Sequence, residues 1–145
     1  MKKLFLAIIA LAAVSLTADA QSAASYQGIS TPTVAAATTA TVSTNNVIGT
    51  IKQQNLALAF TFKLSASGTS NVVYTFARSI DGANYDTITK YTITIPATGT
   101  STNTFSTNLN VGGFTYLRLD SIDNFNATGV LTNIATGYAI KTQAP

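Results

Sequence analysis

Apolar and polar residues alternate with a period of two along most of the chain beyond residue 45. A period of two places every second side chain on the same face of a strand, so this pattern predicts β-structure. The clearest run covers residues 56–64, and its large side chains all fall on one face: Leu56, Leu58, Phe60, Phe62 and Leu64. The other face of the run is small or polar, which predicts a central strand that is closely covered.

Further strands are predicted at short intervals along the chain: 47–51, 72–78, 85–95, 105–111, 114–122 and 130–140. Turn residues separate them, because Asp81-Gly82 favours a hairpin turn, Gly112-Gly113 favours a tight turn and Pro96 ends a strand. In the last run we expect alternate residues from Val130 to Ile140 on one face. The pattern predicts an all-β fold, an antiparallel β-sandwich or jelly roll of about seven or eight strands, with a closed barrel as the alternative.

The first 44 residues differ from the rest. Residues 1–20 combine two lysines, an apolar run and a closing Ala18-Asp19-Ala20, which is the pattern of a secretory signal peptide. A retained N-terminal membrane anchor is the competing interpretation. Residues 21–44 are rich in Thr and Ala, and we expect an extended arm that pairs with a neighbour or lies on a sheet edge. The predicted organisation is therefore a leader, this arm, and a sandwich domain over 45–145.

Composition narrows the possible functions. Only 9% of the 145 residues are charged, and the chain has no Cys, His, Glu or Trp. Without His and Cys there is no nucleophile–base pair of the Ser–His or Cys–His type, and zinc sites built from those residues are absent too. The six cations that follow residue 20 are scattered singly, whereas nucleic-acid binding needs a clustered basic surface. We therefore expect a non-catalytic protein that does not bind nucleic acid.

Two groups of oxygen-bearing side chains could bind calcium. Asp81, Asn84 and Asp86 form the first group, and Asp123, Asn124 and Asn126 form the second. Calcium prefers six to eight oxygen ligands supplied by loops of this kind. Asp and Asn also dominate turns for conformational reasons, and that interpretation is favoured here. No other cofactor is predicted.

Aromatic side chains could provide a sugar-binding surface. Most of them alternate with polar residues, as core residues do. Tyr85 lies beside a turn and Phe125 lies in the 123–129 loop, so these two are the candidates for exposure. Together with Asp81, Asn84, Asp86, Asp123 and Asn126, they form the set of candidate binding residues.

One segment resembles a known group of domains. Residues 72–85 read VVYTFARSIDGANY, which is similar to the strand and S-x-D-G-x-N-aromatic hairpin of small discoidin-like or phage virion-type β-sandwich domains. The run FTYLRL at 114–119 and the stretch 126–140 also look like later strands of those domains. The leader, with Gln21 directly after the expected cleavage site, resembles signal peptides of Bacteroidota. The resemblance implies a sandwich used for assembly or attachment.

Two functions from different classes follow as hypotheses. The first is an exported structural protein of a virion or extracellular surface layer, which packs with other subunits through sandwich faces and the arm. The second is a secreted module that binds a glycan or a cell surface through the 81–86 and 123–129 loops. Both place the protein outside the cell, or on the membrane surface if the leader is retained.

Overall fold

The computed structural model describes residues 27–42, 47–50 and 55–140. These residues form strands and loops, and none of them belongs to a helix that could cross a membrane. The strands, in chain order, are β1 (Gln27–Val34), β2 (Thr38–Thr41), β3 (Val47–Gly49), β4 (Asn55–Leu64), β5 (Asn71–Ser79), β6 (Tyr91–Pro96), β7 (Thr102–Asn110), β8 (Tyr116–Asn124) and β9 (Leu131–Ile140). The predicted all-β fold class is confirmed.

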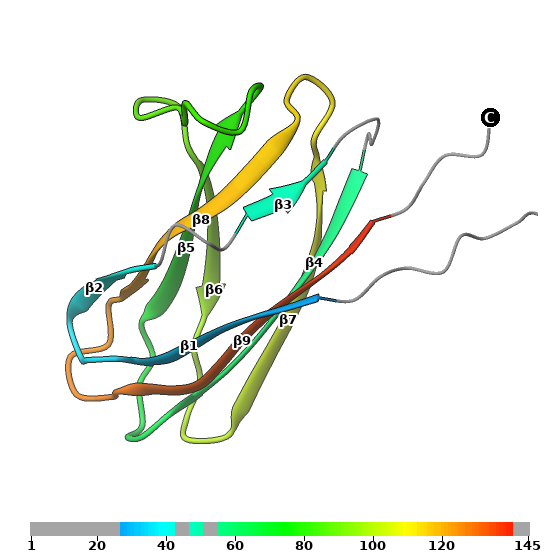
Figure 1. Cartoon of the computed structure of the whole chain (residues 1–145). Helices are drawn as coiled ribbons and strands as arrows, with labels where there is room; N and C mark the ends of the chain where they lie inside the picture. Colours follow the sequence, from blue (N-terminus) through cyan, green and yellow to red (C-terminus); the bar gives the residue numbers. More distant parts are fainter. Residues whose placement is uncertain (1–26, 43–46, 51–54, 141–145) are drawn as a thin grey trace, which may run out of the picture.

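The strands form two antiparallel sheets that face each other as a sandwich (Figure 1). Sheet A has four strands in the order β1-β9-β4-β7. Sheet B has five strands, in the order β2-β8-β5-β6 with β3 also paired to β8. Strands β2 and β3 lie one after the other along the same edge of β8, so together they occupy a single strand position.

The pairing of the strands is nested. The first strand pairs with the last, β2 and β3 pair with β8, β4 pairs with β7, and β5 pairs with β6. This is a long hairpin rolled up so that its successive strand pairs alternate between two sheets. Two further pairings, β4 with β9 and β5 with β8, close the sheets. The topology is that of a jelly roll, one of the two forms that the sequence predicted.

The core lies between the sheets, as the alternating pattern requires. All five large residues of the 56–64 run are buried, from Leu56 to Leu64. They face Val72, Tyr74 and Phe76 of β5, and the Phe60 and Tyr74 rings lie 4.5 Å apart. Edge strand β3 adds Ile48, which is fully buried. Packing between these two faces holds the sandwich together without any disulfide.

The predicted strand over 85–95 is shorter than expected. Strand β6 begins at Tyr91, and residues 80–90 form a long loop rather than a tight hairpin. Gly82 does adopt the left-handed conformation that the turn prediction required, with φ of 78°. The difference arises because backbone N–H groups in this loop donate to the carboxylates of Asp81 and Asp86. These N–H groups are therefore not available to a strand ladder.

The predicted alternation from Val130 to Ile140 also fails at one point. Leu131 and Ile134 are both buried, so the pattern slips by one residue between them. Asn133 lies at the slip with φ of 51°, a left-handed conformation that Asn tolerates better than most residues. From Ile134 onward the expected inward residues Thr136 and Tyr138 are buried.

The structure places most of the predicted 21–44 arm in the sandwich. Strand β1 forms one edge of sheet A, and β2 lies at the edge of sheet B. A turn at Ala37, with φ of 50°, carries the chain from one sheet to the other. Val34 and Val42 are buried in the core. Residues 1–26, with the leader and the first part of the arm, lie outside the described residues.

Candidate functional site

The loop between β5 and β6 is organised by the carboxylate of Asp81. Its Oδ1 accepts hydrogen bonds from the hydroxyl of Ser79 and from the backbone N–H groups of Ala83 and Asn84, at 2.8–2.9 Å. Its Oδ2 accepts from the Asn84 side chain at 2.7 Å. These donors, the Asn84 backbone N–H foremost, lower the pKa of Asp81 well below its usual range. The carboxylate therefore acts as the internal cap of the loop.

Asp86 closes the second half of the same loop. Its Oδ1 accepts from the backbone N–H groups of Ile88 and Thr89 at 3.0 Å. Its Oδ2 accepts from the Arg78 guanidinium at 3.2 Å. The Thr89 and Ile88 N–H groups are the main reason that the pKa of Asp86 is lowered, and Arg78 lowers it further. The two aspartates thus fix the loop in one conformation.

Tyr85 lies between the two aspartates and is covered by Arg118 of β8. The guanidinium carbon of Arg118 lies 4.0 Å from the centre of the Tyr85 ring, a cation–π contact. Arg118 also donates to Asp120 at 2.8 Å, and Lys90 donates to the same carboxylate at 2.9 Å. Burial alone would raise the pKa of Asp120. The hydrogen bonds and positive charges of Lys90 and Arg118 outweigh burial, so the pKa is lowered. One face of the Tyr85 ring is therefore already occupied.

A surface hollow of about 660 Å³ lies between this loop and the turn before β8. Phe114, which is 8% exposed, and Gly113 form its far wall. The hydroxyl of Tyr85 is buried here and has no hydrogen-bond partner among the described residues. The hollow brings together four of the predicted site residues: Asp81, Asn84, Tyr85 and Asp86. Sequence reasoning did not name Arg78 and Phe114 as site residues, and both also line the hollow.

The other predicted site residues lie at the opposite end of the sandwich. Strand β8 separates the two groups, because Tyr116 at its start pairs with Ser79 and Asn124 at its end pairs with Val72. A strand of nine residues is about 30 Å long. The structure therefore does not bring the 81–86 and 123–129 loops together into one binding site.

At that end Phe125 is exposed, as predicted, with 61% of its surface accessible. Asn126 is instead buried, and its amide bonds to Ser70 and to Asn124. Asn124 is buried as well, and its Nδ2 donates to the carbonyls of Ala35 and Gly129. Asp123 accepts a hydrogen bond from Thr39 on the outer face of sheet B. These residues tie loops together and do not face a common ligand.

The described residues contain no cluster of three or more His, Cys, Asp or Glu side chains that could hold a metal ion. Asp81 and Asn84 do lie together, but as hydrogen-bond partners of each other. The second predicted calcium cluster is not assembled, because Asn124 and Asn126 point into the sandwich whereas Asp123 faces outward. The favoured turn interpretation accounts for the geometry of both groups.

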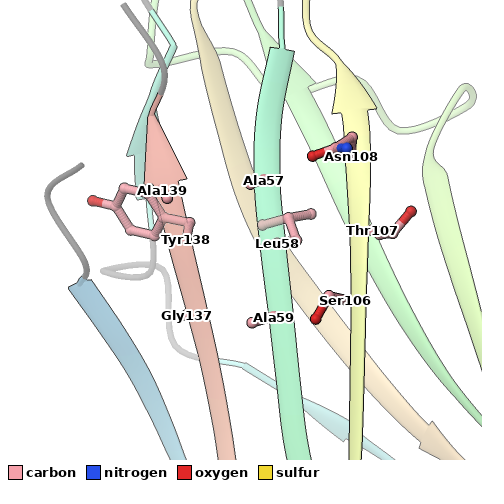
Figure 2. Close-up of a pocket in the computed structure, with 9 residues that line it drawn as sticks. All are labelled: Ala57, Leu58, Ala59, Ser106, Thr107, Asn108, Gly137, Tyr138 and Ala139. Atoms are coloured by element: carbon pink, nitrogen blue, oxygen red, sulfur yellow. The ribbon is translucent and has the colours of Figure 1, made fainter. Parts of the chain in front are cut away.

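A second surface feature covers the outer face of sheet A. The residues along this face are small: Ala57 and Ala59 of β4 lie between Ser106 and Asn108 of β7 on one side and Gly137 and Ala139 of β9 on the other. They line a shallow trough of about 250 Å³ (Figure 2). Tyr138 and Leu58 belong to the same strands but have their side chains buried. The backbone of sheet A is thus open to close approach from outside.

Charge is distributed unequally between the two sheets. The four strands of sheet A carry a single charged residue, Lys63, at one end of β4. The remaining charges of the described chain lie in sheet B or in the loop beside it: Arg78, Asp81, Asp86, Lys90, Arg118, Asp120 and Asp123. The outer face of sheet A is consequently almost neutral.

By its fold, the protein belongs to the class of two-sheet jelly-roll sandwiches. No protein-family model matches the chain, and no curated protein matches it. One similar solved structure, described as a Family 16 carbohydrate-binding module, has 13% identity and a TM-score of 0.40, over 75% of this chain and 72% of that one. Another, from Bacillus endospore appendages described as disulfide-linked pili, has 17% identity and a TM-score of 0.31, over 88% of this chain and 98% of that one. At these scores neither likeness supports a statement about what this chain binds or builds.

Proposed function

We propose that the protein is an exported, non-catalytic structural subunit that packs against other copies through the outer face of sheet A. The observation that carries this proposal is the neutral, small-residue surface around Ala57, Ala59 and Gly137. Sheets pack face to face about 10 Å apart when side chains between them are uncharged and fit together. Small side chains allow close approach, and with Lys63 as the single charge on the described strands of this sheet, repulsion between identical faces is low.

The state of the carboxylates supports a non-catalytic role. Asp81 and Asp86 cap their own loop, Asp120 is paired with Lys90 and Arg118, and Asp123 accepts from Thr39. Hydrolysis by paired carboxylates needs one acid with a raised pKa. The pKa values of Asp81, Asp86 and Asp120 are all lowered instead.

Analytical ultracentrifugation of the mature chain tests the assembly proposal. We expect the wild-type protein to sediment as an oligomer whose size grows with concentration, and Ala57→Asp to remove that growth and give a smaller species. Thr94→Asp, on the exposed outer side of β6 in sheet B, is the matched control and should behave as wild type. A wild-type monomer at all concentrations, or equal effects of the two variants, would contradict the proposal.

Export is the second part of the proposal and rests on the leader sequence of residues 1–20. Mass spectrometry of the protein from its source culture should find a mature chain that begins at Gln21. A chain that still begins at Met1 and partitions with membranes would instead support the retained anchor.

A second candidate function, ligand binding, is favoured by the hollow beside Tyr85. Loop capping by Asp81 and Asp86 preorganises this hollow, and the Asn84 side chain provides a polar group in its lining. A glycan array tests this function. Hits that disappear in Asn84→Ala but persist in Asn108→Ala would support it, and an array without hits would count against it.

A further inference from the structure

The free edge of β7 differs from every other strand edge of the sandwich. An edge strand presents unpaired N–H and C=O groups, and soluble proteins usually protect such edges with proline, charged residues, bulges or short strand length. Strand β1 contains Pro32, and no pairing is formed at that residue. Strands β2 and β3 are only four and three residues long, and β6 is a six-residue strand that follows Lys90 and ends at Pro96.

Strand β7 has none of these features. It is nine residues long, with the sequence TNTFSTNLN, and contains neither proline nor a charged residue. Its pairing with β4 runs without a register shift from Asn55↔Asn110 to Lys63↔Thr102. No described strand pairs with its other side, which forms the outer edge of sheet A (Figure 1).

Both ends of β7 are held in place by asparagine side chains. Near its start, Oδ1 of Asn103 accepts from the N–H of Thr98 at 3.1 Å, and Nδ2 donates to the carbonyl of Ser101 at 3.0 Å. At its end, Oδ1 of Asn110 accepts from the N–H of Gly112 at 2.9 Å. The edge is therefore ordered before any partner binds, which lowers the entropic cost of adding a strand.

The sandwich is also incompletely closed along this side. On the opposite side, three residues close the core, and each of them is at most 7% exposed: Val34, Val42 and Ile48. Along β6 and β7, Ile95 is buried, but four inward hydrophobic residues are only partly buried: Tyr91, Ile93, Phe105 and Leu109. Phe105 packs against Phe60 with 6.5 Å between ring centres, so the edge of the core extends to the free edge of β7.

We infer that β7 pairs with β7 of a second copy of this chain, antiparallel across a two-fold axis, to join the two sheets A into one continuous sheet. A strand edge is complementary to itself in this arrangement, so each residue contact is repeated symmetrically. Thr, Ser and Asn along the exposed face of β7 can pair across the new ladder without like-charge repulsion. Phe105 and Leu109 of the two copies would cover one another at the junction.

This edge contact differs from the face contact proposed above, and either can exist without the other. Edge pairing gives a closed dimer, because each β7 edge is then paired and cannot pair with a third copy. Face packing buries β4 and β9. The two contacts therefore place different residues near their counterparts in the second copy.

Single-cysteine cross-linking distinguishes them, because the wild-type chain has no cysteine. We would make Thr104→Cys, Ser106→Cys and Asn108→Cys on the exposed side of β7 and Thr107→Cys on its inward side. Ala57→Cys reports on face packing, and Thr94→Cys on β6 is the background control. Each purified mature variant is oxidised, and the fraction of disulfide-linked dimer is measured on non-reducing gels.

For the edge dimer we expect β7 cysteines near the two-fold axis to give at least tenfold more cross-linked dimer than Thr94→Cys, whatever the level at Ala57→Cys. Cross-linking at Ala57→Cys but at none of the β7 positions would overturn the edge inference and leave face packing standing. Background levels at every position, with a monomer in sedimentation, would overturn both. Pairing of β7 with β1 of a second copy would also overturn the inference that β7 pairs with β7. That pairing would appear as cross-links only in mixtures of Ser106→Cys with a Ser30→Cys variant.

A charge-swap experiment provides an independent readout. Thr104→Lys together with Asn108→Lys, made in the Ala57→Asp chain so that face packing is already removed, places like charges along both copies of the edge, and we expect the dimer to dissociate. The corresponding double aspartate variant should dissociate alone and form a heterodimer when mixed with the lysine variant. Thr92→Lys together with Thr94→Lys on β6 is the matched control and should leave the dimer intact. A dimer that survives the lysine pair on β7 would contradict the inference.

Discussion

The guanidinium of Arg118 covers the ring of Tyr85 at 4.0 Å and binds Asp120 at the same time. Tyr85 was predicted as an exposed binding residue, and this contact instead makes one face of its ring part of the sandwich surface. The contact links the β5–β6 loop to the outer side of β8. It therefore positions the wall of the hollow in which four of the predicted site residues lie.

Replacing Arg118 should change the ionisation of Tyr85. Burial raises the pKa of this tyrosine, and the positive charge of Arg118 acts in the opposite direction because it favours the phenolate. In Arg118→Gln we therefore expect the Tyr85 pKa to rise further, as measured by NMR titration of the ring. In Arg78→Gln, the control on the neighbouring strand, the Tyr85 pKa should stay closer to the wild-type value. A fall in Arg118→Gln would contradict this account.

Removing the hydroxyl of Tyr74 should stabilise the protein or leave its stability unchanged. This hydroxyl is buried in the core without a hydrogen-bond partner among the described residues, and so is that of Thr136. An unsatisfied buried polar group costs about 1–3 kcal/mol. Tyr74→Phe and Thr136→Val should each raise the free energy of unfolding by up to about 1 kcal/mol. Urea denaturation measures both changes, and a loss above about 1 kcal/mol would mean that the hydroxyl has a partner.

The same tyrosine predicts a loss of stability in alkali. Burial raises the pKa of Tyr74 above its ordinary value of 10.0. Below pH 10 the residue is neutral in both the folded and the unfolded chain. Above that pH the unfolded chain loses the proton first, so stability falls as pH rises towards the folded pKa. Tyr74→Phe should remove this component of the pH profile, whereas Thr136→Val should retain it.

Asn124→Ala should be among the most damaging single polar substitutions. The Asn124 amide joins the β1–β2 turn at Ala35 to the β8–β9 loop at Gly129, and its Oδ1 accepts from Asn126. Its removal leaves several buried groups unsatisfied, so we expect a loss of about 3 kcal/mol or more. Asn108→Ala, on the exposed face of β7, should cost less than about 0.5 kcal/mol. Equal losses in thermal or urea denaturation would contradict this assignment.

Gly82→Ala tests the packing of the β5–β6 loop. Gly82 has φ of 78°, and an added Cβ would lie 3.0 Å from Cε2 of Tyr116. Gly99→Ala is the matched control, because Gly99 has φ of 61° with no atom within 4 Å of an added Cβ. Both variants should lose about 1 kcal/mol from backbone strain. The additional loss in Gly82→Ala, measured by urea denaturation, reports the Tyr116 contact, and an equal loss in both would show that the ring moves freely aside.

The pattern of residues predicted the strands best where one face is fully buried. The 56–64 run became β4 because a period of two places its five large residues on one side of the strand. Residues 85–90 were wrongly included in a strand, since Ile88 suited the alternation but is 92% exposed. Periodicity does not register hydrogen bonds from a carboxylate to its own loop, and those bonds of Asp86 determined the outcome.

The candidate site was predicted only in part, for a related reason. Asp81, Asn84, Tyr85 and Asp86 are neighbours in sequence, so their proximity followed directly. The wall formed by Gly113 and Phe114 depends on how β8 pairs with β5, and local sequence does not specify that pairing. Asn126 was expected at a binding surface, but its side chain is 1% exposed because it bonds to Asn124. An Asn in a loop has the same sequence signature whether it faces solvent or supports the loop.

The nested order of the strands also determines when the molecule can fold. Strand β9 is the last of the described strands to be synthesised, and it lies in the middle of sheet A between β1 and β4. Until residue 140 is available, β1 has no neighbour in the sheet and β4 has β7 alone. Pairings as distant in sequence as Gln27 with Tyr138 form slowly, because the chain must first close a very long loop. Sheet A therefore remains incomplete until the whole of β9 has left the ribosome. Sheet B and the pair of β4 with β7 need no residue beyond 124, so folding of the two sheets is separated in time and sheet A closes last.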